Sequence, residues 1–71
     1  MKIEFTDYTA KSGQEYKLVT VERRGFVYAM VYAEPFPTEA EVRLDFTADR
    51  RHHKKNRAFR PFDTSTRRFI A

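Results

Sequence analysis

The chain has 71 residues, a formal net charge of +4 and no cysteine, and 41% of its residues are hydrophobic. This length allows one small domain, residues 1–71, and the hydrophobic content predicts a folded core. The lack of cysteine excludes disulfides and thiolate metal sites, which fits a cytoplasmic protein. The longest apolar run, residues 26–33, is far shorter than the about 20 residues that cross a bilayer, so we expect no membrane contact.

Alternating apolar and polar residues predict strands in the first third of the chain. Ile3 and Phe5 alternate with charged neighbours, and residues 15–23, EYKLVTVER, are rich in β-branched side chains. The only two glycines, Gly13 and Gly25, follow these segments. Tight turns need a left-handed backbone that glycine adopts without strain, so we predict two successive hairpins.

The third segment, residues 26–33, is apolar on both faces and is predicted to be a central strand. The preceding Arg-Gly and its first residue match the start of the RNA-stacking strand of an RRM. Three later positions depart from that pattern, and residues 10–14 are too few for the helix that an RRM requires, so we reject this resemblance. Tyr28 and Tyr32 remain candidates for stacking on a base, beside their simpler interpretation as core residues.

Residues 38–47, TEAEVRLDFT, allow two interpretations. A Thr-x-x-Glu pattern at their start fits a helix capping box. On a helical wheel, however, Val42 and Phe46 point almost opposite to Leu44, whereas a strand places all three on one face. We therefore predict a strand.

Positive charge is concentrated after this segment. Residues 1–46 hold six basic and eight acidic side chains, a net −2, and residues 47–71 hold eight basic and two acidic side chains, a net +6. The densest part is RRHHKKNRAFR, residues 50–60. For residues 48–59, a short helix and an extended basic loop are both compatible with the pattern. Such segregated charge attracts polyanions more effectively than the same charge spread evenly.

The end of the chain adds a turn, DTST, and a last short strand, RRFI. The whole pattern predicts a mostly β fold, with α+β as the alternative. We expect a small antiparallel sheet of four to five strands or a partly open barrel like those of SH3 and OB domains. This comparison is one of fold alone.

The candidate site is a cationic surface, and binding to phosphates there needs several cations together and no one particular residue. The expected phosphate contacts are Arg50, Arg51, His53, Lys54, Lys55, Arg57, Arg60, Arg67 and Arg68. The aromatic side chains that could stack on a base are Tyr28, Tyr32, Phe59 and Phe62, the last two having an anchoring role in the core as the alternative. A merely solvated basic segment is the simpler explanation of the charge.

These features predict a non-enzymatic protein that contacts DNA or RNA mainly through phosphates, using residues 50–68. The alternative is a small regulator or inhibitor, of the kind that phages and plasmids encode, which binds an acidic protein through the same face. A third hypothesis, a ribonuclease-like enzyme, would use His52 or His53 as an acid or base. We expect no metal and no cofactor, and the exposed sheet edges allow a homodimer.

Overall fold

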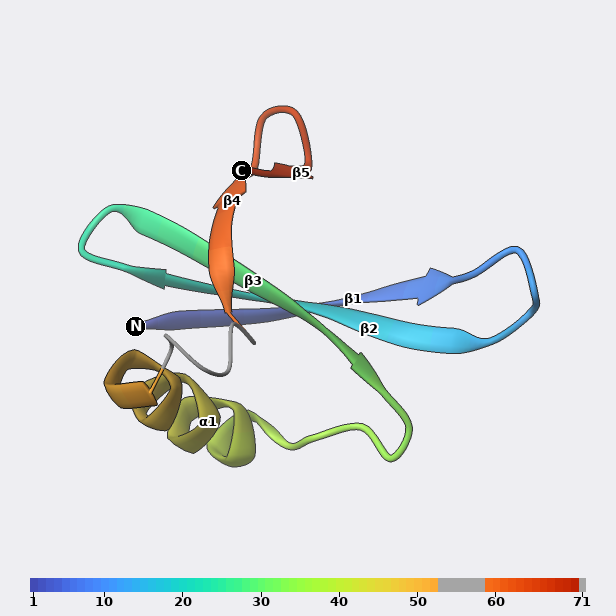
Figure 1. The fold of residues 1–71 in the computed structure, drawn as a ribbon, viewed down its shortest axis with the longest axis horizontal. Helices are drawn as coiled ribbons and strands as arrows, with labels where there is room; N and C mark the ends of the chain where they lie inside the picture. Colours follow the sequence, from blue (N-terminus) through green and yellow to red (C-terminus); the bar gives the residue numbers. More distant parts are fainter. Residues whose placement is uncertain (53–58, 71) are drawn as a thin grey trace.

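The computed structural model describes residues 1–52 and 59–70, with the backbone alone for 49–52. It has five strands and one helix, in the order β1 (Lys2–Thr9), β2 (Glu15–Arg23), β3 (Phe26–Ala33), α1 (Glu39–His52), β4 (Arg60–Asp63) and β5 (Arg68–Phe69). The strands are antiparallel and lie side by side in chain order, so β1 and β5 are the two edges of an open sheet. The predicted small antiparallel sheet is confirmed in its open form (Figure 1).

The first two hairpins form where the glycines predicted them. Gly13 and Gly25 have φ angles of 91° and 81°, in the left-handed region that glycine adopts without strain. The second turn consists of Arg24 and Gly25 alone, because Arg23 and Phe26 are already paired across β2 and β3. Both turn residues are left-handed, as a two-residue type I′ hairpin requires.

The helix α1 packs on one face of the sheet. In Figure 1, α1 lies below β1, β2 and β3, and the β4–β5 hairpin, which belongs to the same sheet, extends above these strands. On the helix side, Val19 and Val21 are fully buried against Val42 and Phe46. Strand β3 lies between β2 and β4, which confirms the predicted central strand.

The predicted strand at 38–47 is wrong, because this segment belongs to α1. The capping box forms at its start: the backbone N–H of Thr38 donates to Glu41 Oε1 at 2.8 Å, and that of Glu41 donates to Thr38 Oγ1 at 3.2 Å. Val42 and Phe46 lie one turn apart and are buried, while Leu44 stays 71% exposed. A narrow apolar stripe is therefore sufficient to hold this helix on the sheet.

The basic run, residues 50–60, lies only partly within the described residues. Of the range 48–59, in which the sequence allowed a helix or a loop, residues 48–52 form the end of α1, and 53–58 lie outside the described residues. Phe59 is again described and is 8% exposed, with its ring 5.2 Å from that of Phe46. The chain thus returns to the core directly before β4.

A β-hairpin closes the chain, as the DTST turn and the RRFI strand predicted. The Asp63 carboxylate accepts hydrogen bonds from the backbone N–H groups of Ser65 and Thr66 and from the Ser65 hydroxyl, at 2.9, 3.4 and 2.7 Å. These bonds stabilise the charged form and hold the pKa of Asp63 below its ordinary value.

The described residues contain no helix with the length and apolar character of a membrane-spanning segment.

Candidate nucleic-acid interface

Two hairpin turns carry arginines in an unfavourable backbone conformation. Arg24 has φ of 54° and Arg67 has φ of 57°, and among the described residues these are the only left-handed positions that glycine does not occupy. In this region the Cβ atom lies too close to a backbone carbonyl, so glycine, asparagine or aspartate is the favoured residue. The turns themselves therefore do not favour arginine at either position.

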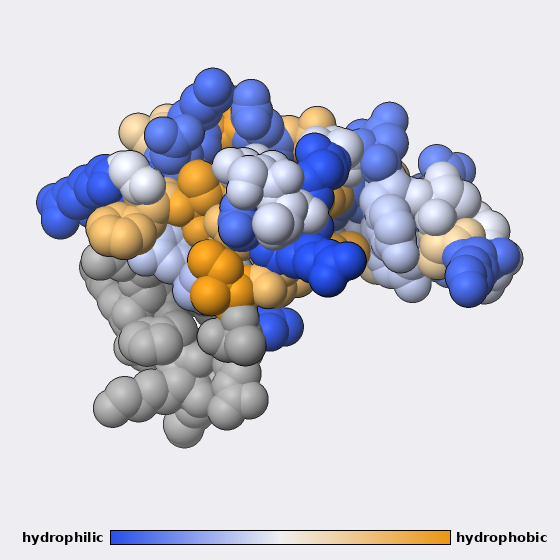
Figure 2. All heavy atoms as spheres, turned by 90° about the horizontal axis from the view of Figure 1, so that it is seen from above, coloured by the Kyte–Doolittle hydropathy of each residue, from blue (hydrophilic) through white to orange (hydrophobic). Residues whose placement is uncertain are grey.

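The β4–β5 hairpin presents three exposed arginines, Arg60, Arg67 and Arg68. The Arg60 guanidinium lies 5.0 Å from the centre of the Phe69 ring, which in turn contacts the Phe62 ring at 5.3 Å. A cation–π contact orients a guanidinium but leaves its charge uncompensated. In Figure 2, which views the molecule from the side of this hairpin, strongly hydrophilic and apolar side chains are interleaved.

Three other described cations form ion pairs within the fold, whereas the three hairpin arginines form none with the described residues. Ion pairs join Lys2 with Glu4 at 3.7 Å, Lys17 with Asp7 at 2.6 Å, and Arg43 with Glu39 at 3.3 Å. Within residues 1–48 and 59–70, five arginines have no such pair: Arg23, Arg24, Arg60, Arg67 and Arg68. Their charge is available to an external anion.

The predicted contacts in the central basic run are only partly described. Arg50 and Arg51 lie in the last turn of α1, with side chains outside the description, while His53, Lys54, Lys55 and Arg57 lie wholly outside it. Figure 1 shows α1 running toward the same end of the molecule as the β2–β3 turn. The backbone of the basic helix end and the Arg24 turn thus share one end of the fold.

Aromatic side chains predicted to stack on bases are largely used by the core. Tyr28 is half-buried with its ring 5.5 Å from that of Phe46, and the Tyr32 hydroxyl donates to Asp45 Oδ2 at 3.0 Å. Phe59 and Phe62 are 8% and 7% exposed. Burial supports the anchoring role that the sequence offered as the alternative for these two phenylalanines.

One highly exposed aromatic side chain, that of Phe26, lies outside the predicted site. Phe26 is 67% exposed, and together with Arg23, Arg24 and Tyr28 it lines a hollow of about 210 Å³. The sequence-based site omitted the first three of these residues. In the sequence these residues are marked only by the order Arg-Arg-Gly-Phe. That order does not show where α1, which covers this face of the sheet, ends.

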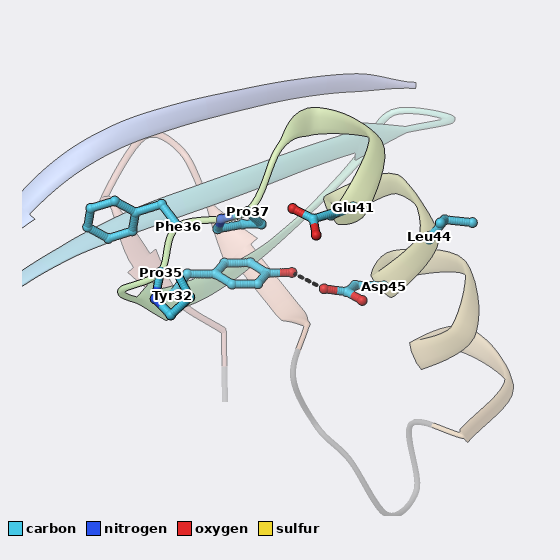
Figure 3. Close-up of a pocket in the computed structure, with 7 residues that line it drawn as sticks. All are labelled: Tyr32, Pro35, Phe36, Pro37, Glu41, Leu44 and Asp45. Atoms are coloured by element: carbon cyan, nitrogen blue, oxygen red, sulfur yellow. Dashed lines mark hydrogen bonds between the residues drawn. The ribbon is translucent and has the colours of Figure 1, made fainter.

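A larger hollow, of about 380 Å³, has the opposite charge. Tyr32, Pro35, Phe36, Pro37, Glu41, Leu44 and Asp45 line it. Figure 3 shows the Glu41 and Asp45 carboxylates entering from α1 beside the Tyr32 ring. No lysine or arginine is among these lining residues, so this hollow repels a phosphate.

Comparison with known proteins adds no relative. No family model matches the chain, and no curated protein or solved structure matches it significantly. The arrangement of charged and aromatic side chains therefore carries the functional argument.

Proposed function

We propose that this protein is a non-enzymatic nucleic-acid-binding domain that contacts phosphates through its basic segment, residues 50–68, and the arginines of the β2–β3 turn. The observation that carries the proposal is the set of five described arginines without an ion pair, two of which occupy left-handed turn positions. A guanidinium offers five N–H donors and matches the geometry of a phosphate.

The same arrangement gives affinity without base readout. Each cation that neutralises a phosphate releases a condensed counterion, so binding weakens steeply with salt, by a log–log slope of about −0.9 per contact on duplex DNA and about −0.7 on single strands. Phosphate contacts position a protein on the backbone and carry no sequence information. Binding should therefore tolerate changes of sequence.

The test measures fluorescence anisotropy of labelled DNA and RNA over a range of salt concentrations. Changing Arg67 and Arg68 together to glutamine should reduce the magnitude of the slope by about 1.4 to 1.8, because two phosphate contacts are lost. Arg43→Gln is the matched control, since Glu39 already neutralises that guanidinium. No binding of the unchanged protein at low salt would end the proposal, and so would equal slopes for the double variant and the control.

An acidic protein surface is the second candidate partner. Phe69 and Ile70 are 37% and 53% exposed beside the hairpin arginines, and aromatic residues and arginine are enriched at protein interfaces. A pull-down with and without nuclease separates the two proposals. Retention of one stoichiometric protein after nuclease supports the protein partner, whereas loss of all captured material supports nucleic acid.

A further inference from the structure

Phe26 lies in an exposed position that the core does not require. It is the first residue of β3, pairs with Arg23 across the hairpin, and therefore shares a face with Arg23 and, two residues on, with Tyr28. Further along this face, α1 covers the sheet, and Tyr28 contacts Phe46 there. Phe26 lies past this contact and keeps 67% of its surface in solvent.

Cations surround this ring on the side of the turn. Directly opposed residues of an antiparallel pair have Cβ atoms about 4.5 to 5.5 Å apart, so Arg23 lies beside Phe26. Arg24 follows in the turn and lines the same hollow, and the half-buried Tyr28 forms its inner wall. An open aromatic face next to two unpaired guanidinium groups matches a base and the phosphates attached to its strand.

We infer that the nucleic acid bound by this domain is single-stranded, and that one unpaired base stacks on Phe26 while Arg23 and Arg24 contact the adjacent phosphates. The inference rests on the proposed function and specifies its ligand. In a duplex, the faces of the bases are already stacked on their neighbours, whereas a single strand exposes them. Stacking is tolerant of sequence because every base has a π face, which agrees with the sequence-tolerant binding expected of phosphate contacts.

The acidic hollow of Figure 3 does not compete for this role. Its rings and prolines resemble a stacking site in shape, but Glu41 and Asp45 line it, and the Tyr32 hydroxyl is bonded to Asp45. A strand bound there would bring its phosphates close to two carboxylates. The Phe26 hollow combines an exposed ring with cations.

The experiment compares three labelled probes of equal length: single-stranded oligothymidylate, the same backbone with abasic sites, and a duplex. The unchanged protein should bind the oligothymidylate most tightly. Phe26→Ala should weaken that complex by about fivefold to a hundredfold, the range that loss of one stacked base produces. The variant should bind the abasic strand as the unchanged protein does, because no phosphate contact is altered.

Two further variants separate stacking from general effects. Phe26→Tyr keeps the ring and should retain the affinity for oligothymidylate. Leu44→Ala removes another exposed apolar side chain, on α1, and should leave all three affinities unchanged.

Equal affinity of the unchanged protein for oligothymidylate and the abasic strand would overturn the inference, as would an unaltered complex with Phe26→Ala. Both results would leave phosphate binding in place. Failure of every probe to bind at low salt would instead remove the proposed function and the inference with it.

Discussion

Replacing Arg24 by asparagine should stabilise the fold and weaken nucleic-acid binding at the same time. The left-handed backbone costs an ordinary L-residue roughly 1 to 2 kcal/mol, and asparagine recovers part of this by hydrogen bonding locally. With φ of 54° at this position, we expect a gain in unfolding free energy of about 0.5 to 1 kcal/mol. For a domain of this size, that gain raises Tm by about 2 to 8 °C.

The expected loss of binding follows from one phosphate contact. Removing it reduces the magnitude of the log–log salt slope by about 0.7 on a single strand. Between 1 M and 0.1 M salt, this change of slope alone corresponds to an affinity loss of about fivefold. The two effects have opposite signs, so a variant that simply unfolds cannot imitate them.

Thermal unfolding followed by circular dichroism gives the stability, and anisotropy against salt gives the binding. Lys11→Asn is the matched control: it also removes one positive charge from a hairpin turn, but Lys11 is not left-handed and lies in the β1–β2 turn at the other end of the molecule (Figure 1). The control should change neither Tm nor the salt slope appreciably. The reasoning is refuted if Arg24→Asn binds like the unchanged protein, or if it lowers Tm.

Three further predictions concern the fold. Phe46→Ala should remove about 3 to 5 kcal/mol and largely unfold a domain of this size, whereas Leu44→Ala, on the exposed side of the same helix, should stay within about 0.5 kcal/mol in denaturant titrations. Thr38→Ala should cost about 1 kcal/mol by removing the capping bond to Glu41, which a lowered Tm would reveal, and an unchanged Tm would mean that the capping box does not stabilise α1. Asp63→Asn should destabilise most above pH 3.8, the ordinary pKa, because the folded protein holds the pKa of Asp63 lower; the difference in Tm from the unchanged protein should shrink as pH falls through that lowered pKa. A difference that grows in acid would contradict this assignment.

The strands were predictable because their signals are local. Period-two alternation marked β1 and β2, Gly25 marked the turn between β2 and β3, and a strand apolar on both faces had to lie inside the sheet. The helix was missed because the buried stripe at its centre consists only of Val42 and Phe46. The Thr-x-x-Glu pattern of the capping box indicated the helix correctly, and its two hydrogen bonds form in the structure. The position of Leu44 was the misleading signal.

The candidate site was predictable in charge but not in place. The distribution of charge along the sequence located the excess of arginine and lysine near the carboxyl end. The described arginines without ion pairs, however, include Arg23 and Arg24 in the first half of the chain. Alternation assigns Phe26 to the same face as Tyr28, but it does not say that α1 covers one of them and leaves the other exposed. That difference depends on where a helix distant in sequence packs.

The most direct test of the central claim is an NMR titration of the protein with a short single-stranded oligonucleotide. We predict that the backbone amide signals of Arg24, Gly25, Phe26 and Arg68 shift during the titration and that those of Gly13 and Glu41 stay in place. Shifts confined to the acidic hollow around Glu41, or signals that do not move at low salt, would contradict the account.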